Sequence, residues 1–506
     1  MRLPWKRWLF LTHRWLGIAL ALVVTAWFFS GIVMLYVPFP ELTPAERRAG
    51  LAVLDFSTAQ LTPAEAAAAV GLPPSAWPVT VRFRMQGERP VYQFGEAGSA
   101  VFADSGEQLE PDGNDAAAAA IDFHARRTGS APGVASIELI EYDQWSLSSA
   151  FRRHLPLYRV QLDDPAGHHY YVSSLTGEVL LDTARRERLL NYFGAVTHWL
   201  YPTVLRRYSA LWSWLVEILA GLAVVMTLTG LWMGWLQWKR KRAPGKRVPY
   251  RGLARWHYFA GVIFGIPALT WSFSGLLSMN PGNLNPWRAP DAMQRAVLAG
   301  ALEHQQPGHF DTLLRHFPAD AVAAQSFYID GEPRLLVTHQ NGRRSQLDPA
   351  GRPVAPPSVA MLAQRLAALL PEETAEIEQL DAYDNYYKPR RHAPDPAPLP
   401  VLRVRFDDQD ATWFHIDPFT GQIIDRLSAS NRLYRWLYNG LHSWDFLWLV
   451  ERRLLWDSVI IVLCSGGFAL SLSGVILGYR RIFGRRHRAR ARIAPAVTIR
   501  SGSRIA

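Results

Sequence analysis

Long apolar stretches interrupt a mostly polar chain at four places, and their lengths predict helices that cross a lipid bilayer. Each contains roughly 20 or more residues with almost no charge, which is the length that an α-helix needs to cross a hydrocarbon core of about 30 Å. The predicted transmembrane helices are residues 15–37, 211–238, 256–279 and 458–479. The chain of 506 residues is therefore predicted to be a multi-pass membrane protein.

Two long segments between these helices, residues 38–205 and 281–450, show mixed helical and strand patterns. Each is predicted to form an α+β domain of two units, in which an Ala- and Leu-rich helix such as LTPAEAAAAV precedes alternating strands such as VTVRFRM. The second unit of each segment closes on a Thr-Gly turn, at 176–177 and 420–421, and a membrane-proximal helix is expected to follow. The Pro-rich stretch 388–400 is predicted to be a loop.

The distribution of charge predicts the orientation of the chain in the membrane. Residues 1–14, 239–255 and 480–506 carry 4, 8 and 9 Lys or Arg residues and no Asp or Glu. The remainder of the chain holds 33 basic and 43 acidic residues, so the net charge of +11 comes from segments that flank apolar helices and does not indicate nucleic-acid binding. The positive-inside rule places both termini and the 239–255 loop in the cytoplasm. The two soluble domains are then periplasmic, in a bacterial inner membrane.

The second half of the chain repeats the first at a spacing of 244 residues, and two histidines recur with it. His13 corresponds to His257, where HRWLGIALALVVTAWFFSG aligns with HYFAGVIFGIPALTWSFSG. His198, in THWLYP, corresponds to His442, in LHSWDF. Neutral imidazole is the usual axial ligand of b-type haem, so four matched histidines in a duplicated membrane protein can hold haem iron between the two halves.

The predicted depths favour two pairs. His13 and His257 precede their apolar stretches and lie near the cytoplasmic ends of their helices, whereas Pro202 breaks the chain and places His198 in a short helix near the periplasmic face. We therefore expect His13 to pair with His257 and His198 with His442. Pairing of His13 with His442 stays open, because helix tilt or a re-entrant segment can bring them together.

Several of these features have simpler interpretations. An interfacial histidine can bind a lipid headgroup or cap a helix, and the GxxxG motifs that begin at Gly230 and Gly474 can serve only helix packing. Glu217 is the one acidic residue within an apolar stretch, and it is equally a proton acceptor or a hydrated side chain near the membrane surface. His168 and His169 can contact iron, although most exposed histidines are merely surface residues without a binding role. Cys464 is the single cysteine, which excludes an intrachain disulfide and covalent attachment of c-type haem.

The motifs quoted above, with the helix ends TGLWMGW and SGVILGY, resemble the PepSY-associated transmembrane helix family, whose members include inner-membrane reductases for iron-siderophores. The resemblance implies an electron-transfer protein in which His13, His257, His198 and His442 are the axial ligands of two b haems. It implies a haem-dependent oxidoreductase that reduces a periplasmic ferric siderophore to release iron. The sequence contains no dinucleotide fingerprint and no P-loop, so the electrons are expected from quinol or a cytoplasmic reductase.

Two other functions remain open at this point. Two parallel repeats are typical of some carriers, so the chain can be a transporter for a siderophore or a small solute. PepSY-like units are also associated with regulation, which makes a noncatalytic, membrane-anchored regulatory module the third interpretation. A haem absorption spectrum separates the first function from both alternatives.

Overall fold

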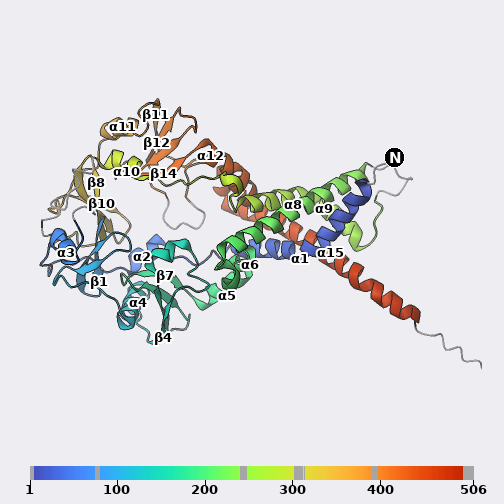
Figure 1. Cartoon of the computed structure of the whole chain (residues 1–506), viewed down its shortest axis with the longest axis horizontal. Coiled ribbons are helices and arrows are strands. Elements are labelled where there is room, and N and C mark those ends of the chain that lie inside the picture. The colour runs from blue at the N-terminus through green and yellow to red at the C-terminus, as the bar shows by residue number, and fades with distance from the viewer. Residues whose placement is uncertain are drawn as a thin grey trace, which may run out of the picture.

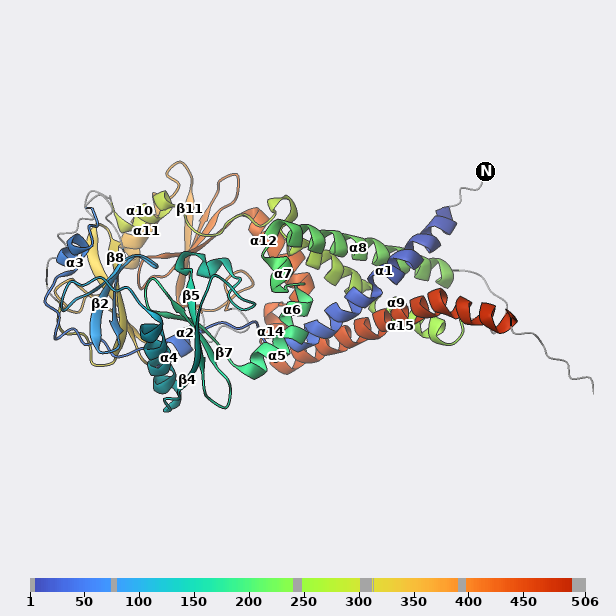
Figure 2. The ribbon, with the colours of Figure 1, turned by 60° about the horizontal axis from the view of Figure 1, so that its bottom comes forward.

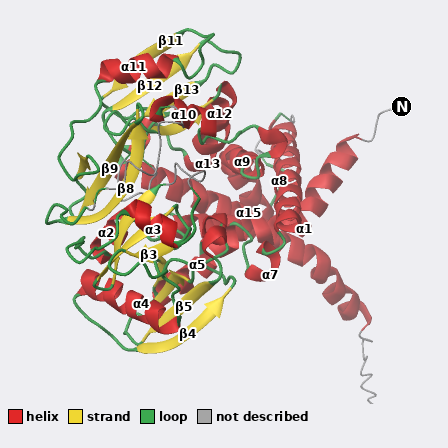
Figure 3. Cartoon of the chain, turned by 60° about the vertical axis from the view of Figure 1, so that its left-hand side comes forward, coloured by secondary structure: helices red, strands yellow, loops and turns green. Residues whose placement is uncertain are grey.

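The computed structural model describes residues 5–73, 80–239, 248–300, 312, 314–389 and 397–493, with the backbone alone for 485–493. A bundle of long helices joins a head of three β-sheets, which all lie at one end of the bundle (Figure 1). We call that end of the bundle the head side and the other end, where the first helix begins, the far side. Figure 3 shows the same separation of strands from long helices.

Four helices are long and apolar enough to cross a membrane, as predicted. They are α1 (Trp5–Met34), α8 (Ser209–Trp238), α9 (Leu253–Leu277) and α15 (Arg453–Ile493). Helices α1 and α15 extend well beyond the predicted spans 15–37 and 458–479. The length of an apolar stretch reflects the thickness of the bilayer core, whereas the helix itself continues into the basic flanking residues, because Lys and Arg are good helix formers. Residues 240–247 of the predicted 239–255 loop and residues 494–506 of the 480–506 tail lie outside the described residues.

The four helices form a closed bundle in which α1 and α9 lie on opposite sides. Helix α1 packs against α15 and α8, and α9 packs against the same two helices (Figure 2). Leu20, Val24 and Phe28 of α1 form one apolar cluster with Ala223 and Ala268. A second cluster nearer the head surrounds Trp456 and Cys464, and Trp271 of α9 packs against both clusters.

Short helices connect the head to the bundle in each half. In the first half they are α5 (Arg185–Phe193), α6 (Ala195–His198) and α7 (Thr203–Arg206). In the second half they are α12 (Ala429–Arg435), a π-helix (Trp436–Gly440), α13 (Leu441–Ser443) and α14 (Leu447–Val450). Pro202 begins α7 with a φ of −66°, so the predicted break after His198 is present.

The head contains one six-stranded sheet and two four-stranded sheets. The six-stranded sheet has the order β10-β9-β8-β1-β2-β3, and the others run β4-β5-β6-β7 and β11-β12-β13-β14. The strands of the first half are β1 (Val81–Gln86), β2 (Arg89–Phe94), β3 (Ala100–Phe102), β4 (Val134–Ile140), β5 (Leu157–Leu162), β6 (His169–Ser173) and β7 (Val179–Thr183). Those of the second half are β8 (Ala321–Ile329), β9 (Glu332–His339), β10 (Arg344–Leu347), β11 (Ala375–Leu380), β12 (Val401–Phe406), β13 (Trp413–Ile416) and β14 (Ile423–Leu427).

The six-stranded sheet corrects the prediction of two separate soluble domains at 38–205 and 281–450. Strand β1 pairs antiparallel with β8, with Arg82 opposite Gln325 and Phe83 opposite Ala324. The first unit of each segment thus contributes three strands to one sheet. A three-stranded unit alone would leave this edge unpaired, and pairing between the halves removes that exposed edge.

The head helices are α2 (Pro44–Gly50), α3 (Pro63–Ala69), α4 (Gly113–Thr128), α10 (Ala292–Ala299) and α11 (Val359–Ala367), with 3-10 turns at Ser149–His154 and Pro281–Asn283. Thr62 and Glu65 form a reciprocal capping box at the start of α3, where the sequence predicts a helix N-terminus. Helix α4 begins directly after Asp112, whose side chain caps its N-terminus.

The two Thr-Gly turns fasten the four-stranded sheets to the six-stranded sheet. Gly177 and Gly421 adopt φ angles of 69° and 71°, which only glycine reaches without strain. The guanidinium of Arg84 donates to the Thr176 carbonyl in the first half, and the Gln346 amide donates to the Phe419 carbonyl in the second. Each half therefore holds its second unit against the shared sheet through a turn.

Candidate functional site

The four histidines predicted as ligands meet in two pairs inside the molecule. His13 of α1 faces His257 of α9 across the bundle, with ring centres 6.4 Å apart and ring planes at 49°. His198 of α6 faces His442 of α13, with ring centres 6.0 Å apart and planes at 75°. The structure brings together the residues that the repeat pairs, and it does not bring His13 to His442.

The pairs lie at different depths. His13 is close to the far side of α1, whereas His198 packs beside Ser30, near its head-side end. The 17 residues from His13 to Ser30 correspond to about 26 Å of helix at about 1.5 Å per residue. The two pairs are therefore separated by most of the thickness of a bilayer core.

The far-side pair is oriented through Nδ1. His13 Nδ1 lies 2.9 Å from the Met226 carbonyl oxygen of α8, and His257 Nδ1 lies 3.2 Å from the Leu470 carbonyl oxygen of α15. Met226 and Leu470 are 244 residues apart, so the contact repeats with the sequence. The Ser473 hydroxyl, 2.8 Å from His257 Nδ1, adds a second contact to the second half.

The head-side pair is oriented in the same manner by α1 and α9. His198 Nδ1 lies 3.1 Å from the Ser30 hydroxyl and 3.2 Å from the Trp27 carbonyl oxygen. His442 Nδ1 lies 2.9 Å from the Ser274 hydroxyl. Ser30 and Ser274 are visible in the aligned motifs as recurring residues, which is a signal that the sequence offers. The carbonyl partners have no sequence signal, because every residue has a carbonyl.

This use of Nδ1 fits the four rings for binding a metal through Nε2. A ring that donates its Nδ1 hydrogen keeps a lone pair on Nε2, and metal-bound histidines in proteins nearly always have such a second contact. Within the described part of the chain, the Nε2 atoms of these four rings have no hydrogen-bond partner. Two imidazoles that share a metal at about 2.0 Å, with about 1 Å more from nitrogen to ring centre, have centres about 6 Å apart. Both pairs have that spacing.

Glycines lie directly beside three of the rings. A Cβ at Gly230 would be 2.7 Å from His13 Cε1, which is closer than side chains approach. A Cβ at Gly474 would be 3.6 Å from His257 Cε1, and one at Gly31 would be 3.6 Å from His198 Cε1. Gly230 and Gly474, the first glycines of two GxxxG motifs, therefore each border a histidine. In a third GxxxG motif of the sequence, Gly261 and Gly265 instead border Leu470 and Leu231, which is ordinary helix packing.

Glu217 lies in α8, and its carboxylate accepts a hydrogen bond from Ser213 one turn earlier, at 3.1 Å. The contact satisfies one carboxylate oxygen within the helix itself. It links Glu217 neither to a histidine pair nor to another helix.

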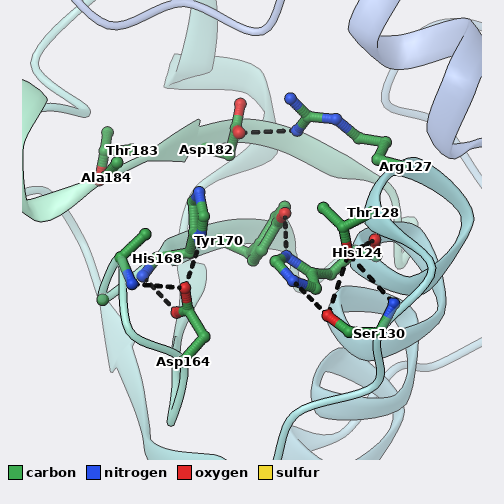
Figure 4. Close-up of polar contacts among 12 residues, drawn as sticks. His124, Arg127, Thr128, Ser130, Asp164, His168, Tyr170, Asp182, Thr183 and Ala184 are labelled. Atoms are coloured by element: carbon green, nitrogen blue, oxygen red, sulfur yellow. Dashed lines mark hydrogen bonds and ion pairs between the residues drawn. The ribbon is translucent and has the colours of Figure 1, made fainter.

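The adjacent histidines of the head do not act together. His168 packs against His124, with ring centres 5.1 Å apart, and its Nδ1 lies 2.8 Å from an Asp164 carboxylate oxygen (Figure 4). Burial, helped by the nearby His168, lowers the pKa of His124, whose Nδ1 lies 2.9 Å from the Tyr170 hydroxyl. Successive side chains of a strand point to opposite faces, so His169 lies on the other face of β6. The described residues contain no cluster of three or more His, Cys, Asp or Glu residues with metal-binding geometry.

A hollow of about 200 Å³ in the head lies where the first Thr-Gly turn meets the six-stranded sheet. Arg47, Arg82 and Arg84 line it together with Glu178, which forms two bonds of 2.8 and 2.9 Å with Arg82. Burial alone would raise the pKa of Glu178, but the charges of Arg82 and Arg84 outweigh it and lower the pKa to about 2. Glu178 thus matches part of the arginine charge and joins the two units.

The model of one known family, described as the PepSY-associated TM region, matches residues 10–328 and again residues 254–500. The two matches begin 244 residues apart, which is the spacing of the histidine pairs. A search of curated proteins gives no match to the chain.

Proposed function

The chain belongs to the PepSY-associated transmembrane family, and from that premise we propose that it is a di-haem b protein of the bacterial inner membrane that reduces a ferric siderophore. The proposal rests on one observation: four imidazole rings face one another in two pairs, and each ring is held through its Nδ1 atom. His13 with His257 would hold one haem and His198 with His442 the other. When bound, the haems supply one-electron transfer across the bilayer.

The residues of the chain hold and insulate the two sites. Carbonyls of α8 and α15 orient the far-side rings, and serines of α1 and α9 orient the head-side rings. Apolar side chains around Phe28 and Trp271 fill the bundle between the pairs and exclude water. A dry, low-dielectric surrounding and fixed axial ligands are the means by which a protein sets the potential of a haem.

The basic segments support a periplasmic position for the head. Residues 5–14 and 480–493, the described parts of two basic segments, lie at the far side of the bundle (Figure 1). The full segments 1–14 and 480–506 carry Lys and Arg without acidic residues. The positive-inside rule then assigns the far side to the cytoplasm. The electron donor is proposed to be quinol or a cytoplasmic reductase, and the acceptor a ferric chelate on the head side. We also propose that the chain arose by duplication of an ancestral half, because the contacts of its histidines recur at a spacing of 244 residues.

The absorption spectrum of protein purified from haem-replete cells tests this function. We expect a Soret band, α and β bands on reduction, and about two haems per chain. His13→Ala and His442→Ala should each lose about half of the haem, whereas the control His168→Ala, in the head, should lose none. Folded wild-type protein without colour would exclude the proposal and favour transport or regulation.

A further inference from the structure

The second half contains an aromatic stack beside His442. The ring of Tyr438 stacks on the His442 ring with centres 5.4 Å apart and planes at 25°. Tyr434 lies on the other side of Tyr438, with ring centres 5.3 Å apart. Tyr438 belongs to the π-helix Trp436–Gly440, a rare helical form that frequently marks functional sites.

The matching positions of the first half have no such stack. Leu190 and Gly194 stand 244 residues before Tyr434 and Tyr438. Gly194 ends helix α5 with φ −94° and ψ −111°, where the second half continues as a π-helix. The His198 ring therefore lacks the continuous aromatic contact that His442 has.

The aromatic stack ends at a small cavity lined by basic residues. The cavity measures about 60 Å³, and its lining includes Tyr434, Asn285, Tyr386, Arg288, Arg432 and Arg435. No Asp or Glu contributes to its described lining. Three guanidinium groups beside a neutral aromatic surface favour an anionic, oxygen-bearing ligand.

Arg288 is ion-paired with Asp425, whereas Arg432 and Arg435 keep hydrogen-bonding capacity after their protein contacts are counted. Arg432 donates to the carbonyls of Ala411 and Leu427 and, within the described residues, has no carboxylate partner. Arg435 is paired with Asp445 through Nη2, but its buried Nη1 has no partner among the described residues. Buried donors in proteins are nearly always satisfied, so an unpartnered guanidinium nitrogen on a residue that lines the cavity indicates a missing acceptor.

We infer that this cavity binds a carboxylate-type group of the electron acceptor, and that Tyr434 and Tyr438 connect the bound acceptor to His442. The inference rests on the proposed function and assigns the exit of the electrons to the second half. The cavity has room for one ligand arm and not for a whole chelate, since sites for complete small molecules measure about 300 Å³ or more.

The reduction step requires no chemistry from the tyrosines. One electron passes from the head-side site to the chelate, whose Fe(III) becomes Fe(II). The donor site is oxidised because it loses that electron. Burial raises the pKa of Tyr434 to about 12, so its phenol stays protonated at neutral pH. The tyrosines act as packed tunnelling medium and keep their oxidation and protonation states.

Binding of gallium(III) citrate to the full-length protein in zwitterionic nanodiscs tests the site without electron transfer, because gallium(III) is not reduced. Calorimetry should show Arg435→Gln weakening binding at least tenfold and Arg432→Gln about three- to tenfold. Arg188→Gln, at the position that matches Arg432 in the first half, should bind like wild type. Absent wild-type binding, or wild-type affinity in both Arg435→Gln and Arg432→Gln, would overturn the inference. So would loss of binding when phosphatidylglycerol is added, since it would assign the cavity to lipid phosphate.

Tyrosine variants test the connection separately. Tyr438→Leu should retain the haem spectrum and the gallium citrate affinity but slow reoxidation of the reduced protein by saturating ferric citrate at least tenfold. Tyr438→Phe keeps the ring and should behave like wild type. An unchanged rate in Tyr438→Leu would contradict the connection. A coloured protein that fails these tests leaves the proposed function standing, whereas a colourless protein fails the proposed function itself.

Discussion

His198 and His442 occupy matching positions in the two halves, yet their surroundings differ. The Nδ1 atom of each ring contacts a serine hydroxyl of the long helix against which the histidine packs. Among the described residues, a tyrosine stacks on the ring of His442 and none on that of His198, and a basic cavity lies beyond the stacked tyrosine. The comparison teaches that the features that position the rings recur in both halves, whereas the aromatic stack occurs in one. The proposed di-haem protein would then have two similar sites and a single exit.

The largest effect is expected at the ion pairs that hold the two Thr-Gly turns against the shared sheet, where the two halves can be compared. Glu178→Gln should destabilise the head by about 3 kcal/mol, because it leaves the half-buried Arg82 and the buried Arg84 without their carboxylate. Asp417→Asn removes an ion pair with Arg344 at the second Thr-Gly turn, but Asn can still accept from the Phe419 N–H of the turn, so it should cost less. Thermal unfolding followed by tryptophan fluorescence measures both.

The same comparison has a pH dependence. The pKa of Glu178 is lowered to about 2 from the ordinary value of 4.5, so its stabilisation is complete above about pH 5 and is lost as the pH falls towards 2. The difference between wild type and Glu178→Gln should therefore shrink on acidification below about pH 4. A constant difference from pH 7 to pH 3 would contradict the assigned ion pair.

The next effect concerns the glycines beside the far-side pair. Gly230→Ala places a Cβ 2.7 Å from His13, whereas Gly474→Ala makes only ordinary contact with His257 at 3.6 Å. We expect Gly230→Ala to cost about 1 to 3 kcal/mol and to reduce haem content towards one per chain. Gly474→Ala should keep both haems, as counted by pyridine haemochrome absorbance. Equal haem loss in the two variants would show that the halves do not differ here.

A smaller effect distinguishes the serines. The Ser274 hydroxyl is the one hydrogen-bond partner of His442 Nδ1 among the described residues, whereas His198 keeps the Trp27 carbonyl when Ser30 is removed. Ser274→Ala should therefore weaken the head-side site by about 1 kcal/mol, and Ser30→Ala by less. Redox titration of the α band measures the shift in potential, and a larger shift for Ser30→Ala would contradict the assigned contacts.

The smallest effect is expected at Glu217, which has no counterpart in the second half. Its carboxylate bonds only to Ser213 on the same helix in the described structure. Glu217→Gln keeps that bond and should change stability by less than about 0.5 kcal/mol, with haem content unchanged. A large loss of electron transfer in this variant would instead assign Glu217 a role in proton uptake.

Local patterns made the membrane helices and the histidine pairs predictable. Apolar length identifies a span regardless of its neighbours, and the spacing of 244 residues links His13 to His257 before any contact is known. The pairing of β1 with β8 was not predictable, because alternation indicates a buried face but not which strand lies alongside. The stack of Tyr438 on His442 was missed for a similar reason. It depends on a π-helix, and the usual helical period gives no sign of one.

The joint between β1 and β8 also has a consequence for biosynthesis. Residues that pair there are about 240 positions apart in the chain, so the N-terminal hairpin is made long before its neighbour exists. Until the second segment arrives, β1 presents an open edge to other chains, which is a known route to aggregation. Cells that make this protein should therefore depend during that interval on a chaperone on the side of the membrane where the head folds.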